Sequence, residues 1–379
     1  MNFGDVYKNK TVLITGHTGF KGSWLSEWLL LLGARVVGYS LVEPPSEPSH
    51  FNALQLADYM TEDMRGDVRS LDALQSMINR HKPDFIFHLA AQPLVREGFN
   101  EPYYTVETNV MGSLNVLEAV RRENSNCIVI MITTDKVYEN NEWVYSYRES
   151  DPLGGHDPYS ASKACADIVT SSYQRSFFDD GQNTAVDSTI AVASVRGGNV
   201  IGGGDWARDR IVPDCMRSLA GNKAIPVRNR RATRPWQHVL ELLGGYLHLG
   251  SEISGAISQG NRERLRALCT SFNFGPQITS NKTVAELVHE ILKHWSGEWE
   301  DFTEPGATYE AGRLNLTIDK AYHTLKWQPR WNFEETIKHT VDWYRQYYKA
   351  AQPEPATMRE LTRQQIHSYA EVLNDNVGA

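Results

Sequence analysis

A glycine-rich segment near the start of the chain restricts the possible folds more than any other feature. Residues 16–22 read GHTGFKG and follow residues 11–15, an apolar, β-branched run that is typical of a buried strand. The next residues, 23–32, have the pattern of a helix that ends before Gly33. A strand, a glycine turn and a helix in this order are typical of a dinucleotide-binding unit, in which the diphosphate lies at the positive end of the helix.

The three glycines of this segment have separate expected roles. Gly16 allows a tight turn, Gly19 allows the backbone to approach a pyrophosphate, and Gly22 allows the helix to pack closely on the strand. Their spacing is G-x-x-G-x-x-G and not the commoner G-x-G-x-x-G, so an ordinary strand-to-helix turn is the alternative; the flanking patterns count against it. The predicted cofactor loop consists of Gly16, His17, Thr18, Gly19, Phe20, Lys21 and Gly22.

Composition and charge exclude several classes of protein. The 379 residues suffice for one large or two medium domains, and the net charge of −8 provides no basic field for nucleic acid or an acidic membrane. The most apolar stretch, which begins at Trp24, is interrupted by Glu27 and Arg35, so no membrane-spanning helix is expected. The four cysteines are widely separated and lack metal-ligand spacing. We therefore expect a cytoplasmic protein with reduced thiols, no bound metal, and no nucleic-acid or membrane partner.

The second predicted strand, residues 35–39, bears on the choice of cofactor. An acidic residue at its end would normally bind the adenosine ribose, but Ser40 stands there and offers a hydrogen bond without a charge. No arginine follows that could bind a 2′-phosphate, and Glu43 would repel one. Lys21 is the one nearby cation in the sequence that favours NADP. The balance predicts NAD, with Ser40 at the ribose.

Two later segments are predicted to complete the cofactor site. Asp67 and Val68 follow a strand-like run and are expected to line an adenine pocket, with Asp67 accepting a hydrogen bond from the base amine. The start of a helix capped by Ser70 is the alternative reading of this segment. Residues 85–91 form another buried strand, in which His88 is interpreted as a core histidine. The small carboxyl end of this strand lets a dinucleotide lie across Leu89, Ala90 and Ala91.

Polar residues gather at the end of a fifth strand, residues 127–133. The triplet Thr-Asp-Lys at 134–136 follows it directly, where ligands bind in a doubly wound sheet. Asp157 and Pro158 open the next helix, on which Tyr159 and Lys163 are four residues apart and share one face. A Tyr-x-x-x-Lys pair alone is common in ordinary helices. Together with the glycine loop and the triplet, in this order, it indicates an enzyme.

The regular alternation of strands and helices fades after a sixth strand, residues 192–196. Arginines gather at positions 228–234 of an otherwise acidic chain, which indicates a diphosphate-binding site. Residues 258–270 are polar and basic and are predicted to be an exposed insertion, and no structure is assigned from residue 353 onward. Helices are further predicted at residues 104–122, 283–295 and 333–348.

The predicted fold class is α/β, a doubly wound parallel sheet of Rossmann type with a smaller C-terminal domain for the substrate. Residues 1–190 are expected to form the dinucleotide-binding domain. Residues 191–350 are expected to form mainly the substrate-binding domain, partly interleaved with the sheet, and residues 351–379 a tail.

Five short motifs in this order resemble those of a known family. They are TGxxGxxG at 15–22, HLAA at 88–91, TTDxVY at 133–138, YxxxK at 159–163 and RxxNV at 196–200. Together they are similar to the extended short-chain dehydrogenase/reductases that act on nucleotide sugars. The resemblance covers roughly residues 8–348. It implies a nucleotide sugar as substrate and NAD as cofactor.

Within that family, the Thr-Asp-Lys triplet is the informative feature. Nucleotide-sugar 4,6-dehydratases carry Thr-Asp-Glu at this place, whereas 4-epimerases carry Ser or Thr without the acid pair; here Lys136 stands in place of the glutamate. The lysine and the opening sequence, NKTVLITGHTGFKGSWLSEWLLLLGA, resemble the branch that acts on CDP-glucose. This resemblance implies a lyase that forms a 4-keto-6-deoxy sugar from CDP-glucose, a step in deoxysugar biosynthesis of the lipopolysaccharide type.

The chemistry of a 4,6-dehydratase gives each polar residue an expected role. Tyr159 would act as a phenolate base at the C4 hydroxyl, supported by cationic Lys163, which would also bind the nicotinamide ribose. Thr134 would hydrogen-bond the C4 oxygen. Asp135 would donate a proton to the leaving C6 hydroxyl, and Lys136 would remove the C5 proton. An ion pair between Asp135 and Lys136 is the alternative, and it would remove both roles.

The resemblance also implies partners for the substrate and for the chain. Asn199 and Arg234 match positions that bind the diphosphate, and Arg208 is a further candidate. A homodimer is expected through the helices that bear Asn109 and Tyr159, with a homotetramer as the alternative. Because Ser40 replaces an acid and His17 stands in the loop, we expect loosely bound NAD that exchanges with solvent.

Two other functions remain open on the sequence. A nucleotide-sugar 4-epimerase shares the tyrosine, the lysine and the cofactor, but it has no use for an acid and a base at C5 and C6. A non-enzymatic dinucleotide-sensing protein needs the cofactor alone, and the retained Tyr159, Lys163 and Arg234 count against it.

Overall fold

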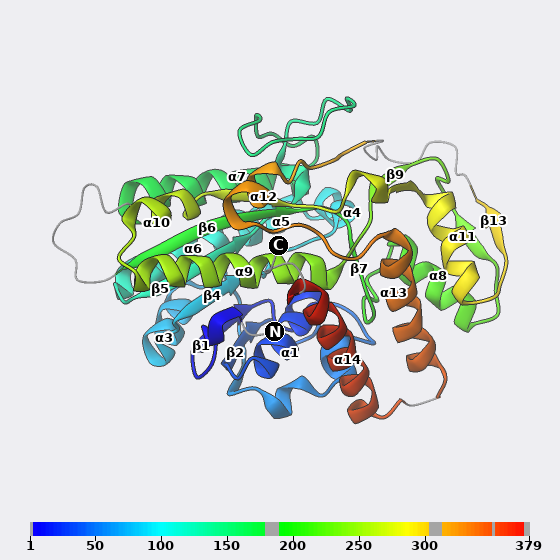
Figure 1. Ribbon diagram of the computed structural model, residues 1–379, viewed down its shortest axis with the longest axis horizontal. Helices are drawn as coiled ribbons and strands as arrows, with labels where there is room; N and C mark the ends of the chain where they lie inside the picture. Colours follow the sequence, from blue (N-terminus) through cyan, green and yellow to red (C-terminus); the bar gives the residue numbers. More distant parts are fainter. Residues whose placement is uncertain (1–2, 179–188, 303–312, 351–352, 375–379) are drawn as a thin grey trace.

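A parallel sheet forms the centre of the molecule (Figure 1). The structure is a computed structural model that describes residues 3–178, 189–302, 313–350 and 353–374. Within these ranges, seven strands pair in the order β11-β6-β5-β4-β1-β2-β3, all parallel. The strands are β1 (Thr11–Thr15), β2 (Arg35–Ser40), β3 (Glu62–Arg65), β4 (Phe85–His88), β5 (Cys127–Ile132), β6 (Ile190–Gly197) and β11 (Ser271–Phe274). The predicted doubly wound sheet is confirmed, and its order reverses at β1, where such sheets bind ligands beyond the strand ends.

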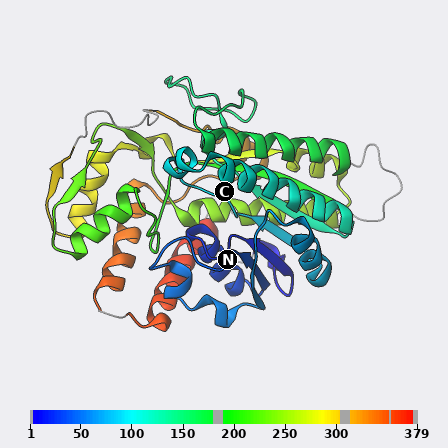
Figure 2. The ribbon, with the colours of Figure 1, turned by 180° about the vertical axis from the view of Figure 1, so that it is seen from behind.

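Helices cover both faces of the sheet, which explains why its central strands β1, β4 and β5 are mostly apolar and fully buried. Val12 and Ile14 of β1 belong to one core, and Leu13 between them belongs to the other. The first face carries α1 (Phe20–Leu31) and α9 (Val239–Ser258). The opposite face, in front in Figure 2, carries α3 (Leu71–His81), α6 (Gly112–Glu123) and α7 (Pro158–Tyr173).

A smaller region lies beyond the carboxyl ends of the strands, on the right of Figure 1. Its three two-stranded sheets pair β7 (Val200–Ile201) with β10 (Gln237–His238), β8 (Ile225–Val227) with β13 (Trp299–Asp301), and β9 (Thr233–Pro235) with β12 (Asn281–Thr283). Its helices are α8 (Ile211–Ala220), α11 (Val284–His294) and α13 (Phe333–Tyr348). A further helix, α12 (Asp319–Leu325), packs against β11 and α9. The predicted helices at 283–295 and 333–348 are confirmed.

The structure refines two sequence predictions. The helix expected at 104–122 is confirmed, and within it α5 (Pro102–Val106) and α6 are joined by a five-residue π turn, Glu107–Met111. The segment 258–270, expected to be an exposed insertion, is largely exposed, but it is not irregular: α10 (Arg262–Leu268) forms there, capped by the side chain of Asn261. Leu268 is fully buried in the core beneath it.

The C-terminal helix, α14 (Pro355–Asn374), packs against α1. Arg359 and Arg363 both donate to the fully buried carboxylate of Glu27, with Nε–O distances of 2.9 and 2.5 Å. Of the expected tail, residues 351–352 and 375–379 lie outside the described residues. Shorter helical segments are α2 (His50–Ala53), α4 (Val95–Asn100) and turns at Phe3–Asp5, Leu56–Tyr59, Asp135–Val137, Gln174–Phe178 and Ile278–Ser280.

None of the helices in the described ranges combines the length and the apolar character that a membrane span requires.

Candidate active site

The glycine loop has the close contacts that its spacing predicts. Gly16 has a φ of +76°, and a side chain there would lie 2.7 Å from the backbone nitrogen of Ala90. A Cβ on Gly22 would overlap the carbonyl oxygen of Gly16. The tight turn at Gly16 and the close packing at Gly22 are therefore confirmed. Gly19 is the N-cap of α1 and has no side chain to occupy the positive end of the helix.

His17 turns away from solvent into the core. Its imidazole is fully buried and hydrogen-bonds Ser40 Oγ at 2.9 Å and Asp63 Oδ1 at 2.7 Å. The ring lies against Gly38, where a Cβ would overlap it. Burial lowers the pKa of His17, and the bond to Asp63 opposes that shift. The His17 side chain therefore packs against β2 and does not lie over the N-terminus of α1. This position counts against the expectation that His17 weakens cofactor binding.

The cations near the cofactor loop are arranged differently from the prediction. Burial and the charge of Arg210 lower the pKa of Lys21 to about 8, while the charge of Asp135 raises it. Lys21 is therefore close enough to Asp135, at the end of β5, to interact with it electrostatically. The cation at the end of β2 is instead Arg65, which donates to the carbonyl oxygens of residues 41 and 42 at 3.2 and 3.0 Å. The parallel register pairs Arg65 with Ser40, which sequence spacing could not reveal. Its charge is offset by Asp63 at 2.7 Å.

The residues predicted to contact adenine lie at the ends of β3 and β4. Asp67 accepts from the Nε and Nη2 of Arg69 at 2.9 and 2.7 Å, so its carboxylate is already shared. Val68 is buried opposite Gly112. Leu89, Ala90 and Ala91 are half-buried beside the glycine loop.

His88 is a core histidine, as the sequence predicts. Its ring nitrogens hydrogen-bond Thr15 Oγ1 at 2.7 Å and Ser113 Oγ at 3.1 Å. Burial lowers its pKa to about 3, and the charge of Lys163 acts in the same direction. Asn109, also fully buried, bonds both backbone groups of Gln92 and so has a structural role.

Thr134 and Asp135 stand together at the end of β5. Thr134 Oγ1 donates to Asp135 Oδ1 at 3.0 Å. The carboxylate is 2% exposed, and its Oδ2 has no hydrogen-bond partner among the described residues. A Cβ on Gly198 would lie 3.0 Å from this oxygen and 3.3 Å from Pro235 of β9. A buried carboxylate oxygen without a partner, at the meeting point of the sheet and the smaller region, is a group prepared for a ligand.

Tyr159 and Lys163 lie on α7 and are both buried. Burial raises the pKa of Tyr159 to about 12, although the hydrogen bond to Thr134 lowers it. Burial lowers the pKa of Lys163 to about 7, and the nearby charge of Lys21 adds to this shift. The Nζ atom of Lys163 donates to the carbonyl oxygen of Ile132 at 2.8 Å. The chain alone therefore favours the neutral forms of both groups, and the expected phenolate needs additional positive charge.

Lys136 is half-buried beside this cluster. Its backbone nitrogen donates weakly to Thr134 Oγ1 at 3.4 Å. In the described parts of the chain, no ion pair joins Lys136 to Asp135, so the alternative that would remove both roles is not observed. The same described parts contain no cluster of His, Cys, Asp or Glu that could hold a metal ion.

The predicted substrate residues lie in the smaller region. Arg234 of β9 is half-buried and donates to the carbonyl oxygen of Thr233 at 2.8 Å. Asn199 follows β6, and its carbonyl oxygen accepts from the backbone nitrogen of Gln237 at 3.3 Å. Arg208 is exposed.

The sequence analysis missed Arg210, which lies two positions further along. Its Nη1 donates to Asp205 at 2.8 Å, and its charge lowers the pKa of both Tyr159 and Lys21. The segment carries no periodic pattern that distinguishes Arg210 from Arg208, and the fold alone brings Arg210 near Tyr159.

Comparisons with known proteins agree with this geometry. The family model of the GDP-mannose 4,6 dehydratases matches residues 13–340. A CDP-glucose 4,6-dehydratase of Salmonella typhimurium is 41% identical over 358 residues, which cover 94% of this chain and 96% of that protein. A CDP-paratose 2-epimerase of Salmonella typhi is 27% identical, covering 88% of this chain and 98% of that protein.

Solved structures share the fold. A dTDP-glucose 4,6-dehydratase from Bacillus anthracis, crystallised in complex with NAD, superposes with a TM-score of 0.71 at 21% identity. The match covers 90% of this chain and 98% of that one.

Proposed function

The chain belongs to the GDP-mannose 4,6-dehydratase family, and on that premise we propose that it is an NAD-dependent CDP-glucose 4,6-dehydratase. The reaction yields CDP-4-keto-6-deoxyglucose and water. One observation carries this proposal beyond the family. Asp135 follows Thr134, which is hydrogen-bonded to Tyr159. The Oδ2 atom of Asp135 is buried and has no hydrogen-bond partner in the described parts of the chain. A carboxyl group held this way serves an elimination, and a simple epimerisation at C4 has no use for it.

The residues of the glycine loop fit a dinucleotide. The first turn of α1 begins at Gly19 with no side chain over it, and a Cβ on Gly16 or Gly22 would fill the space of the turn. We assign the diphosphate to this helix end and the nicotinamide ribose to Lys163. When bound, NAD accepts a hydride from C4 of the sugar and later returns it to C6, so it is regenerated in each cycle.

The side chains of this chain handle the protons. Tyr159 removes the C4 hydroxyl proton, and its acidity is raised by the Thr134 hydrogen bond and by added positive charge. The 4-keto group then acidifies C5, whose proton passes to Lys136. Asp135 protonates the C6 hydroxyl as the C6–O bond breaks and water leaves. Lys136 returns its proton to C5 at the end.

We further propose that the smaller region binds the nucleotide sugar. Arg234 and Asn199 are assigned to the diphosphate, with the exposed Arg208 as a further contact. In this division residues 1–190 hold the cofactor and residues 191–350 mainly hold the substrate. The enzyme acts in the cytoplasm on a deoxysugar pathway of the lipopolysaccharide type.

An exposed apolar face supports a homodimer. Tyr103 and Val106 on α5, Met111 in the π turn that follows, and Ile168 on α7 are 44 to 79% exposed. These helices are packed side by side, so two copies could bury the face as a four-helix bundle. Sedimentation equilibrium tests the dimer, and Ile168→Lys is expected to yield monomers. A tetramer would show a second interface.

The first experiment incubates the protein with NAD and CDP-glucose, with UDP-glucose and dTDP-glucose in parallel, and follows the sugar nucleotides by mass spectrometry. Loss of one water from CDP-glucose alone is the expected result. Loss of water from another nucleotide instead would retain the reaction and change the substrate. An unchanged mass with a new isomer on chromatography would identify a 4-epimerase and overturn the proposal.

A further inference from the structure

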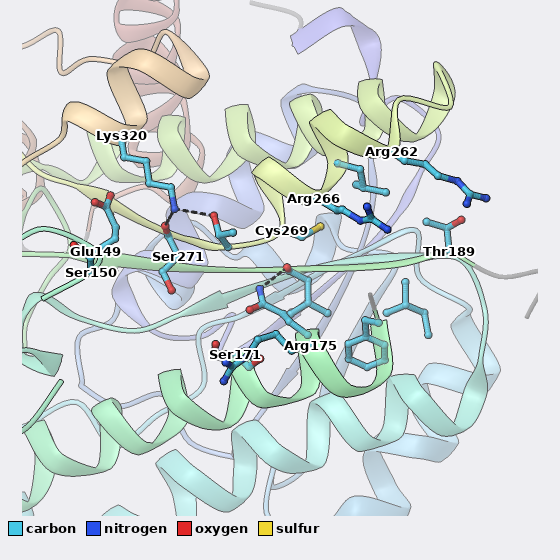
Figure 3. Close-up of a pocket in the computed structure, with 16 residues that line it drawn as sticks. Glu149, Ser150, Ser171, Arg175, Thr189, Arg262, Arg266, Cys269, Ser271 and Lys320 are labelled. Atoms are coloured by element: carbon cyan, nitrogen blue, oxygen red, sulfur yellow. Dashed lines mark hydrogen bonds between the residues drawn. The ribbon is translucent and has the colours of Figure 1, made fainter. Parts of the chain in front are cut away.

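A second cavity lies far from the catalytic residues. Its volume is about 580 Å³, and it opens between the C-terminal end of α7, α10 and the first residues of β6 and β11 (Figure 3). The smaller region lies at the other end of the molecule from α10 (Figure 1). Arg175, on the rim, lies about 18 Å along the helical chain from Lys163 at 1.5 Å per residue. The cavity is therefore separate from the site described above.

The charge of the cavity is opposite to that of the chain. Four of its lining residues are cations, and one, Glu149, is an acid, whereas the whole chain has a net charge of −8. The cations are Arg175, Arg262, Arg266 and Lys320. The arginines come from two sides, since α10 supplies two of them and the end of α7 supplies the third. Arginine forks from two directions suit a phosphate group, which each can bind through two hydrogen bonds.

Apolar side chains form another part of the wall. Phe178, Ile190 and Leu265 line the cavity together with the half-buried Cys269. The volume is within the range of pockets that enclose small organic ligands, and it is larger than an inorganic phosphate needs. Cations and apolar side chains that line one cavity fit a phosphorylated molecule that also carries a ring.

We propose that this cavity binds a nucleotide, with its phosphates at the three arginines and its base against Phe178 and Leu265. Nothing in the dehydratase reaction requires such a site. It is a second ligand site on the enzyme, and its occupant is a nucleotide that is not undergoing the reaction.

A short chain of contacts connects this cavity to the catalytic lysine. Lys320, on the cavity wall, donates to the carbonyl oxygen of Ser271 at 2.8 Å. The hydroxyl of Ser271 donates to Asp167 Oδ1 at 3.3 Å. Asp167 lies one helical turn after Lys163, and its charge supports the protonated form of that lysine by raising the pKa. A ligand that attracts Lys320 would disturb this chain, so occupancy is expected to change turnover.

Cys269 provides a direct test of binding, because it lines the cavity and Cys165, exposed on α7, serves as an internal control. The full-length protein is alkylated with iodoacetamide, with and without CTP, ATP or inorganic pyrophosphate, and each cysteine is followed by peptide mass spectrometry. At least one nucleotide is expected to slow alkylation of Cys269 at least fivefold and to leave Cys165 unchanged. Equal protection by pyrophosphate would overturn a nucleotide site, and so would no protection at millimolar concentrations.

Charge reversal separates this site from other nucleotide effects. Arg262→Glu and Arg266→Glu are expected to abolish the protection of Cys269, whereas Arg80→Glu, an exposed arginine on α3, should leave it intact. The same nucleotide is then added to steady-state assays at saturating substrate. A change in kcat of twofold or more in the unmodified protein, absent in both cavity variants, is expected. Protection of Cys269 with an unchanged kcat would overturn the connection to Lys163. Alkylation does not depend on activity, so this test can fail while the dehydratase assignment stands.

Discussion

Lys163 and Asp167, one turn apart on α7, are both buried, but they differ in whether their charge has a partner. Asp167 is paired on every side: Arg196 donates to both carboxylate oxygens at 2.9 Å, and Thr133 donates at 3.0 Å. Lys163 forms no ion pair within the described residues and donates to one carbonyl oxygen. Burial therefore lowers the pKa of Lys163 to about 7, while Arg196 keeps its charge.

This difference separates Lys163, which we assign to the reaction, from Asp167, which stabilises the fold. Lys163 and the unpartnered Oδ2 of Asp135 are costly to the folded chain, and a ligand supplies what they lack. The ion pair of Asp167 and Arg196 holds β6 to α7 and needs no ligand. Substitutions in the two regions should therefore affect different measurements.

The largest effect is expected from Asp135→Asn. An amide keeps the shape of the side chain and its bond with Thr134, but it cannot donate a proton to the leaving hydroxyl, so kcat for water loss should fall about 10²- to 10⁴-fold. The free energy of unfolding should not decrease, because the substitution removes a buried carboxylate that has an unpartnered oxygen. Mass spectrometry of CDP-glucose and urea unfolding measure the two effects. Retained water loss within tenfold would show that Asp135 is not the acid.

Arg196→Met should have the opposite profile. Removing one partner leaves the buried carboxylate of Asp167 without its counter-ion, which typically costs about 3–5 kcal/mol. The free energy of unfolding in urea is expected to fall by this amount. The double variant Asp167→Leu/Arg196→Met should recover part of the loss, since no buried charge remains. If Arg196→Met were as stable as the parent, the ion pair of Asp167 and Arg196 would not stabilise the fold.

Lys163→Met is expected to inactivate the enzyme and to stabilise the cofactor-free chain in a pH-dependent manner. The lowered pKa means that the folded chain releases this proton near pH 7, whereas the unfolded chain holds it to about pH 10.4. The unfolded state binds more protons in that interval, so this lysine makes stability rise with pH between 7 and 10. Removing it should stabilise the folded chain by roughly 4 kcal/mol more at pH 6.5 than near pH 10.5, because the two pKa values differ by about 3.4 units at 1.36 kcal/mol each.

Thermal unfolding of the two proteins at pH 6.5, 8.5 and 10.5 measures this gain. Lys136→Met serves as the matched variant, since it also removes a lysine of the catalytic cluster. A gain that does not shrink with rising pH would show that Lys163 is not the titrating group.

The smallest effect is expected from Lys338→Ala, which removes an ion pair on the surface of α13. Lys338 and Asp342 are 2.7 Å apart, but both are exposed, so water already solvates them. The free energy of unfolding should change by less than about 0.5 kcal/mol. If Lys338→Ala lost as much stability as Arg196→Met, burial could not explain why the two ion pairs differ in strength.

Sequence patterns predicted the helices, strands and turns that depend on neighbouring residues in the chain. The strand, turn and helix around Gly16 and Gly22 follow from the conformations that glycine permits, and α7 begins where Asp157 caps it with Pro158 in its first turn. The amphipathic α13 was predicted to the residue, because one face is buried and the other is wet.

Elements without such a pattern were missed. No helix was assigned to α9 from the sequence, since its first nine residues, 239–247, are all buried and no polar face marks their period. The network of Asp167 and Arg196 joins residues 29 positions apart, and no spacing rule connects them. The position of Arg65 opposite Ser40 at the end of β2 likewise depends on strand register. In each case the missing information was a partner distant in the sequence.

The contact between α1 and α14 has a consequence for synthesis of the chain. Glu27 and Arg359 are 332 positions apart, so a ribosome makes the carboxylate roughly 15 to 70 s before its partner, at 5–20 residues per second. During that time the first helix of the nucleotide fold cannot bury Glu27 against a positive charge. A chain interrupted before residue 359 lacks both arginines that pair with Glu27, so its first helix should be less stable than in the longer chain. The helix α14 thus supplies both arginines that pair with Glu27 of α1, and α1 gains these ion pairs only after residue 363 has been made.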